Sequence, residues 1–187
     1  MTTEHSLFPV QMAANWHSPE TYTLPNRLRD WLLDPSSLTA RLKCHCREFR
    51  VEVLGQKIIA CDAREANDDI IADEQVLVRE VLLYCDDMPQ VFARSLLPLS
   101  SLTGAQQQLA HLGTQSLGQV LFNHPELLRK KIEVAAFDQQ STVAKIAEHL
   151  SLPVVQPMWG RRSVFVLDAK PLMVAEVFLP GAIAYLK

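Results

Sequence analysis

The sequence predicts an α+β fold: a six-stranded antiparallel sheet with helices on one face, built from a duplicated unit of two helices and three strands. Two helical segments followed by three strand-like segments occur twice, and the second half has one additional helix before its last two strands. A shift of 82 residues superposes six identical residues without a gap, among them Arg79 on Arg161 and Asp86 on Asp168. Short connections between successive strands predict antiparallel pairing.

Composition sets the broad class of protein. The 187 residues suffice for one domain with a sizeable core, spanning residues 1–187 with an irregular lead-in over residues 1–23. The apolar fraction of 48% and charged fraction of 21% are typical of a globular protein, and the net charge of -3 indicates no general attraction to nucleic acid or anionic membrane. No apolar run approaches the roughly 20 residues of a membrane helix, and no secretory signal is visible. We therefore expect a cytoplasmic monomer without stable membrane insertion.

In the first half, Leu24, Leu28, Trp31 and Leu32 recur at helical spacing. The segment "DPSS" ends this helix and caps a second one. From Phe49 the apolar period changes to two, which predicts a strand with a bend near Gly55. A polar loop, "CDAREANDDIIADE", precedes a hairpin formed by "EQVLVREVLLYC" and "QVFARSLLP" around the turn "DDMP".

The second half repeats this order. We predict a helix in "SSLTGAQQQLAHLG", closed by Gly113, and another from Ser116 in "SLGQVLF". The segment "HPELLRK" continues or restarts that helix, so that "LLRKK" reads as a solvated helix end. A strand, "KKIEVAAF", and a helix in the connecting segment "STVAKIAEHL" follow. The last two strands, "RRSVFVL" and "LMVAEVFL", meet at the turn "DAKP".

Three charged residues interrupt apolar strands: Arg79, Arg94 and Glu176. Burial of a lone charge is costly, so each needs a partner or a solvated position. Under the 82-residue shift Glu176 is the counterpart of Arg94. One interpretation is that these are internal ion pairs or outward-facing residues. The other is a pocket with an anion-binding arginine at one end and a carboxylate at the other, suited to a flat apolar ligand with one carboxylate and one hydroxyl.

Other motifs give weaker signals. The pattern "CHC" at 44–46 lacks the spacing and the second ligand pair of a zinc site, so we expect reduced thiols and no metal. The pattern "GRR" at 160–162 lacks the rest of a phosphate-binding loop. Ser141, Ser163 and Cys85 have no histidine or acid at a nearby spacing that would mark an activated nucleophile.

The chain resembles the chorismate pyruvate-lyase (chorismate lyase) family of bacterial ubiquinone biosynthesis. The resemblance rests on "RDWLLDPSSLTARL", "VLVREVLLYCDDMPQVFARSLLPLSSLTG", "LGTQSLGQVLF" and "WGRRSVFVLDAKPLMVAEVFLP", which lie in this order from about residue 29 to 180. It implies a duplicated fold with helical flaps over an internal site. The segment 138–158 departs from the family by its greater length, which leaves the geometry of that connection open.

The resemblance also implies roles for individual residues. Arg79 would hold the carboxylate of substrate or product, and Glu176 would hydrogen-bond the ring hydroxyl. Leu117 corresponds to a flap leucine whose backbone amide contacts the carboxylate, and Leu38 stands where a relative carries Met. Arg94 or Arg161 is a weaker candidate for binding the side-chain carboxylate.

The implied reaction removes pyruvate from chorismate and leaves 4-hydroxybenzoate, with no cofactor and no metal. Whether Glu176, with basicity raised by apolar neighbours, is a base or only orients the hydroxyl stays open. We expect product inhibition, with flap opening as a rate-limiting step. Two alternatives remain: a non-catalytic effector-binding domain of the same fold, and a lyase that yields 3-hydroxybenzoate. The lead-in of residues 1–23 is too short for a helix-turn-helix unit, which disfavours the former.

Overall fold

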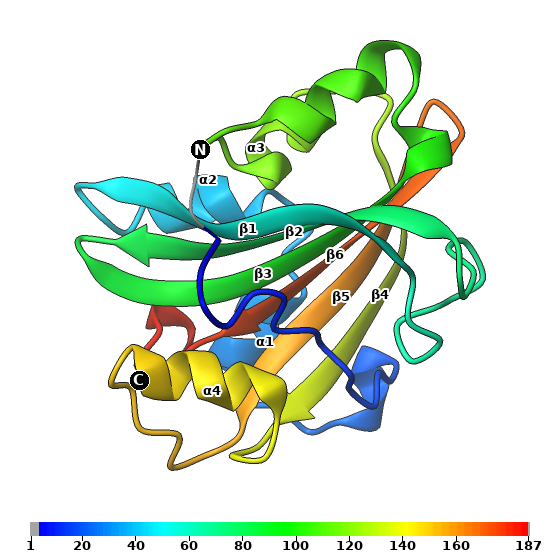
Figure 1. The fold of residues 1–187 in the computed structure, drawn as a ribbon. Coiled ribbons are helices and arrows are strands. Elements are labelled where there is room, and N and C mark those ends of the chain that lie inside the picture. Colours follow the sequence, from blue (N-terminus) through cyan, green and yellow to red (C-terminus); the bar gives the residue numbers. More distant parts are fainter. Residues whose placement is uncertain (1–3, 187) are drawn as a thin grey trace.

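The computed structural model describes residues 4–186, which form one six-stranded antiparallel sheet in the order β1-β2-β3-β6-β5-β4 (Figure 1). The strands are β1 (Phe49–Ala60), β2 (Gln75–Cys85), β3 (Met88–Pro98), β4 (Leu128–Phe137), β5 (Met158–Leu167) and β6 (Lys170–Phe178). The helices are α1 (Asn26–Leu32), α2 (Leu38–Lys43), α3 (Leu117–Phe122) and α4 (Thr142–His149), with 3-10 turns η1 (Pro19–Thr21), η2 (Leu99–Ser101), η3 (Gly104–His111) and η4 (Ile183–Tyr185).

The α+β class and the antiparallel sheet are confirmed, and the two halves of the chain meet between β3 and β6. Each half contributes three neighbouring strands and ends in a hairpin at the predicted turn. The central residues of both turns have positive φ: Asp86 and Asp87 in the first, Asp168 and Ala169 in the second. Two-residue turns of this kind match the twist of the strands that they join. The sheet therefore has the strand order expected of a duplicated unit of two helices and three strands.

The two hairpins differ by one residue. In the first hairpin Tyr84 pairs with Pro89 but Leu83 pairs with Val91, so Gln90 is an extra residue in β3. The second hairpin has no such shift. A one-residue insertion of this kind is a β-bulge, and every residue beyond it changes to the other face of the sheet.

The bulge corrects one prediction. Ser95 lies opposite Arg79, while Glu176 lies opposite Arg161. The structural counterpart of Glu176 is therefore Ser95. Our assignment of Arg94 as that counterpart is wrong, because an 82-residue shift without a gap ignores the extra residue in β3.

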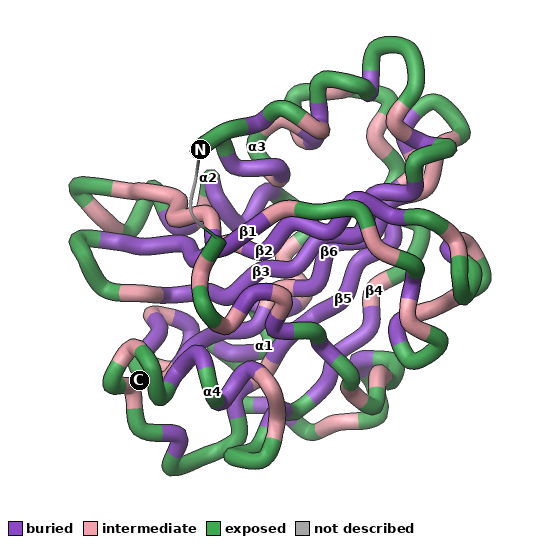
Figure 2. Tube along the Cα trace, viewed as in Figure 1, coloured by how far each residue is buried: buried purple, intermediate pink, exposed green. Residues whose placement is uncertain are grey.

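Helices cover both faces of the sheet (Figure 1). On one face α1 and α2 bury Trp31 and Leu42 against Phe178, and α3 packs Leu121 on the same face. On the other face α4 buries Ile146 in a cluster that includes Phe92. The prediction of helices on one face thus holds for α1, α2 and α3, whereas α4 and the N-terminal segment lie on the opposite face. The middle of the sheet is buried from both sides (Figure 2).

Local signals set the helix ends. The side chains of Ser37 and Ser116 cap α2 and α3 by accepting hydrogen bonds from backbone amides three residues on. Segment 104–111 is 3-10 rather than α-helix. The prediction that "HPELLRK" is helical is wrong. Pro125 disfavours a helical backbone at the residue before it, His124, so α3 does not continue through this segment. α3 ends at Phe122, and β4 already begins at Leu128.

Arg94 lies in a buried ion cluster on the α4 face. Its Nε and Nη2 donate to both carboxylate oxygens of Glu65 at 2.7 Å each, and its Nη1 donates to Glu80 at 2.6 Å. Glu80 also accepts from the backbone amides of Val10 and Gln11 at 2.8 and 3.1 Å. Burial alone would lower the pKa of Arg94, and the two carboxylates more than offset that effect and raise it. Arg94 thus anchors the 61–74 loop and the N-terminal segment, and the prediction that it binds substrate is corrected.

Replacement of Arg94 tests this anchoring role. Arg94→Met leaves Glu65 and Glu80 buried without a cationic partner, so we expect a loss of about 3–5 kcal/mol in the free energy of unfolding. Urea denaturation measures this loss. The control is Arg64→Met, which removes an exposed ion pair with Asp62 and should leave the free energy of unfolding nearly unchanged. Equal stabilities of the two variants would contradict the role assigned to Arg94.

Candidate active site

A closed cavity of about 30 Å³ lies between the sheet and the N-terminal ends of α2 and α3. Arg79 on β2 and Glu176 on β6 both line it, so the two predicted charges share one face and one cavity. The rest of the lining is apolar or neutral: Thr39, Val81, Leu83, Ala93, Ser95, Gln115, Ser116, Leu117, Gly118 and Val174. The arrangement offers one positive and one negative group to an enclosed molecule.

Arg79 is buried, with 3% of its surface exposed, yet no carboxylate among residues 4–186 pairs with it. Its Nη2 donates to the carbonyl oxygens of Gly113 and Gln115 at 2.7 and 3.1 Å. Burial lowers the pKa of this guanidinium. The cross-strand neighbour that could have been an acid is Ser95. Arg79 therefore keeps a charge that neutral carbonyls only partly balance, as an anion-binding group requires.

Glu176 has a different environment from the one predicted. Its Oε2 accepts a hydrogen bond of 2.7 Å from Nε of Arg161, its hydrogen-bond partner among the described residues. Arg161 in turn donates to the carbonyl oxygens of Leu32 and Asp34 at 3.2 and 3.1 Å. The expectation that Glu176 has apolar neighbours alone is therefore wrong, because Arg161 lies opposite it and their ion pair fixes the orientation of the carboxylate. The same contact makes Arg161 a positioning residue for Glu176.

Two short flaps close the cavity: the first flap is residues 37–43, and the second is residues 113–122. Thr39 Oγ1 and Ser116 Oγ share a hydrogen bond of 2.5 Å between them. Lys43 Nζ donates to Gln119 Oε1 at 2.9 Å, which joins the flaps a second time. The second flap also supplies the two carbonyls that hold Arg79.

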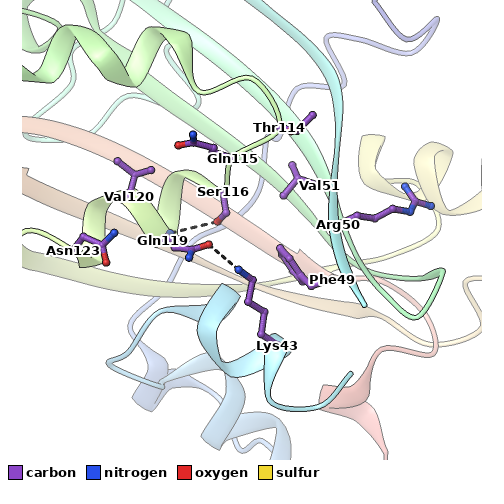
Figure 3. A pocket seen from close by; sticks show the side chains of 10 residues that line it. All are labelled: Lys43, Phe49, Arg50, Val51, Thr114, Gln115, Ser116, Gln119, Val120 and Asn123. Carbon is purple, nitrogen blue, oxygen red and sulfur yellow. Dashed lines mark hydrogen bonds between the residues drawn. The ribbon is translucent and has the colours of Figure 1, made fainter. Parts of the chain in front are cut away.

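On its outer side the second flap borders a groove of about 530 Å³, shown in Figure 3. Gln115 and Ser116 line both the groove and the closed cavity. Lys43 stands in the groove, whereas the guanidinium of Arg50 points away from it and pairs with Glu52 and Asp87. The cavity of about 30 Å³ is far smaller than the roughly 300–1,000 Å³ of typical small-molecule pockets. Entry of an aromatic ring therefore requires the second flap to move outward, toward the groove.

Three of the residues predicted from the sequence line the cavity, and Leu38 does not. Arg79, Glu176 and Leu117 line the cavity, whereas Leu38 is buried in the core beside it and its neighbour Thr39 takes the lining position. Ser95, Gln115 and Ser116 were missed. Ser95 could have been found only by placing the bulge in β3, for which the single sequence carries no clear signal.

The fold resembles solved domains of bacterial transcriptional regulators. The C-terminal domain of the histidine utilization repressor from Pseudomonas syringae pv. tomato matches 75% of this chain and 96% of its own, with a TM-score of 0.57 and 17% identity. The effector domain of PhnF from Mycobacterium smegmatis matches 77% of this chain and 88% of its own, with a TM-score of 0.56 and 17% identity. At such identities the likeness concerns the fold alone. No described helix is long and apolar enough to cross a membrane.

Sequence relatives are far more similar. A probable chorismate pyruvate-lyase of Psychromonas ingrahamii is 42% identical over 97% of this chain and 98% of its own length. One from Shewanella loihica is 38% identical over 94% and 92% of the two chains. The chorismate lyase family matches residues 10–186. This chain belongs to the chorismate lyase family.

Proposed function

We propose that this protein is a carbon–oxygen lyase that eliminates pyruvate from chorismate and leaves 4-hydroxybenzoate, the first step of ubiquinone biosynthesis. The observation that carries the proposal is the unpaired Arg79 and the carboxylate of Glu176 on one closed cavity, in a member of the chorismate lyase family. The two groups match the two ends of the product, a carboxylate and a hydroxyl across an aromatic ring.

Binding follows from these charges. Arg79 exchanges the carbonyls of Gly113 and Gln115 for the ring carboxylate, which is a stronger, charge-assisted partner. Glu176, held by Arg161, accepts the hydrogen bond of the C4 hydroxyl. Val81, Ala93 and the other apolar lining residues contact the ring faces. Leu117 stands at the start of α3 beside the carboxylate end.

The proposed reaction requires the protein to orient the substrate, and it forms no covalent bond to the protein. The C4 hydrogen leaves as a proton, the C3–O ether bond breaks, and the ring becomes aromatic. The released enolpyruvate takes up a proton and becomes pyruvate, so atoms and electrons balance without redox change. Glu176 is placed at the C4 end, where it orients the hydroxyl and can accept the proton. Closure by the two flaps excludes water and fixes the ether in a reactive conformation.

The product retains the two groups that Arg79 and Glu176 bind. It leaves only when the second flap opens, which breaks the Thr39–Ser116 and Lys43–Gln119 hydrogen bonds. Product inhibition and slow release follow from this geometry.

The direct test is to mix the purified protein with chorismate, in the presence of chelator and without cofactor, and to identify the products. We expect 4-hydroxybenzoate and pyruvate in equal amounts. Formation of 3-hydroxybenzoate would reject the proposed regiochemistry. Tight binding of 4-hydroxybenzoate without turnover of chorismate would instead identify an effector-binding domain.

The free charge of Arg79 can be tested at Ser95. Ser95→Glu recreates the Arg161–Glu176 pairing of the other half and gives Arg79 an internal partner. We expect the Kd of 4-hydroxybenzoate to rise at least tenfold more than in Ser95→Gln, which has the same size without the charge. Isothermal titration calorimetry measures both values. Equal affinities of the two variants would show that Arg79 does not hold the carboxylate.

The role of Glu176 is tested by Glu176→Gln, which preserves shape and removes the charge. If Glu176 takes the C4 proton, the rate of the chemical step falls about 10²- to 10⁴-fold, the usual contribution of general acid–base catalysis. Single-turnover kinetics separate this chemical step from product release. An unchanged single-turnover rate would mean that Glu176 only orients the hydroxyl and that the leaving group takes the proton.

The link between the flaps predicts a faster product release in Thr39→Val. Valine keeps the shape of threonine but cannot share a hydrogen bond with Ser116. Since a hydrogen bond contributes about 0.5–1.5 kcal/mol, the dissociation rate of 4-hydroxybenzoate should rise roughly two- to tenfold. Stopped-flow displacement gives this rate, with Thr142→Val, outside the flaps, as the control. A slower or unchanged release would argue that the second flap opens without breaking this contact.

A further inference from the structure

A second polar group of residues lies beside Glu176, on the two outer strands of the same sheet face. In β5, Ser163 lies opposite Val174 and Arg161 lies opposite Glu176; both partners on β6 line the cavity. On the edge strand β4, Arg129 lies opposite Phe165, two residues beyond Ser163 on the same face. The polar groups of Arg129 and Ser163 are not used by the contacts described so far.

Arg129 is an arginine with incomplete partners. Its Nη1 donates to the carbonyl oxygen of Asp34 at 3.0 Å, and its guanidinium lies 5.6 and 4.9 Å from the ring centres of Phe122 and Phe165. Its Nε is buried and has no hydrogen-bond partner among the described residues. Burial, and then the positive charge of Arg161, lower the pKa of Arg129 to about 10. A cation placed in this way lacks an anion.

Ser163 is fully buried, and its Oγ also has no hydrogen-bond partner within the described chain. Buried polar atoms without partners are rare, because each costs about 1–3 kcal/mol relative to a satisfied one. An unsatisfied hydroxyl and an unsatisfied guanidinium nitrogen on adjacent strands indicate that something else completes their bonding.

The balance of charges on the cavity face indicates the charge of a ligand that would bind Arg129 and Ser163. On the cavity face three buried or half-buried arginines, Arg79, Arg129 and Arg161, meet one half-buried carboxylate, Glu176. Asp34 nearby is already paired with Arg41 at 2.7 Å. On the opposite face, by contrast, Arg94 binds two glutamates and Arg162 binds one. The cavity face therefore carries an excess of two positive charges, which suits a ligand with two carboxylates.

We infer that Arg129 and Ser163 form the subsite for the second carboxylate of the substrate, that of the enolpyruvyl group. The inference rests on the proposed function, since chorismate is a dianion whose enolpyruvyl ether stands next to the C4 hydroxyl at Glu176. The guanidinium of Arg129 binds the carboxylate, and the Ser163 hydroxyl donates a hydrogen bond to it. The product 4-hydroxybenzoate lacks this carboxylate. The subsite thus distinguishes substrate from product, which Arg79 and Glu176 cannot do.

A competing role for Arg129 is structural. It joins the chain before α2, through Asp34, to the end of α3, through Phe122, and so connects the bases of the two flaps. A purely structural role would weaken the binding of substrate and product alike, because both need the same closed flaps.

The two roles are separated by comparing ligands. For Arg129→Gln we expect the KM for chorismate to rise on the order of ten- to hundredfold, while the inhibition constant of 4-hydroxybenzoate stays within about twofold of its original value. Arg129→Lys, which keeps the charge, should recover part of the KM. Ser163→Ala should raise the KM only severalfold, since it removes a neutral hydrogen bond. The control Arg64→Gln makes the same charge change at an exposed site.

A parallel rise of both constants in Arg129→Gln, or no rise in KM, would overturn the inference. If Arg129→Gln does not fold, the same comparison in Ser163→Ala and Arg129→Lys decides the question, because an effect confined to chorismate is required there too. The outcome is distinct from failure of the proposed function, in which the unmodified protein would not convert chorismate at all.

Discussion

The site depends on Arg79, an arginine that the fold leaves without an acidic partner within residues 4–186. Arg79 and Arg161 occupy matching places in the two halves of the sheet, but only Arg161 has a glutamate across from it. At these two matching positions the duplicated framework thus produces an ion pair in the second half, and in the first half an arginine with no acidic partner among the described residues. Placed together under the flaps, the ion pair presents an oriented carboxylate and Arg79 presents an anion-binding group.

Buried charges are balanced on one face of the sheet and unbalanced on the other. On the α4 face, Arg94 is fully paired, and its carboxylate partners fasten the 61–74 loop and the N-terminal segment to the strands. This network serves stability, because each of its charges has a partner. On the cavity face the positive charges outnumber the negative ones. A buried charge that is left unbalanced is expensive, so such an imbalance marks a place where a ligand completes the structure.

Much of the fold could be predicted from the sequence because hairpins and helix caps are local. The turns "DDMP" and "DAKP", the caps Ser37 and Ser116, and the order of elements required no tertiary information. The convergence of Arg79 and Glu176 was also predictable, from apolar alternation on both strands and from the family resemblance. The face covered by α4 was not, because periodicity reveals an apolar stripe without saying which side of a sheet it contacts.

Two other failures have a common cause. The bulge at Gln90 moves Arg94 to the far face, and the early start of β4 places Arg129 in a strand rather than in a solvated helix end. In both cases the register of one residue decides which face a long charged side chain occupies. Composition and spacing do not fix that register, since it is set by strand pairing between distant segments.

In the closed protein the carbonyls of Gly113 and Gln115 accept hydrogen bonds from Arg79, so they compete with any incoming anion for this guanidinium. A small anion that offers only a carboxylate replaces two existing hydrogen bonds and must also displace the second flap, so its net gain is small. A ligand that spans the cavity adds contacts at Glu176 and along the ring, which offset the opening cost. The arginine is thereby shielded from the abundant simple carboxylates of the cell, and occupancy is reserved for molecules long enough to reach both ends.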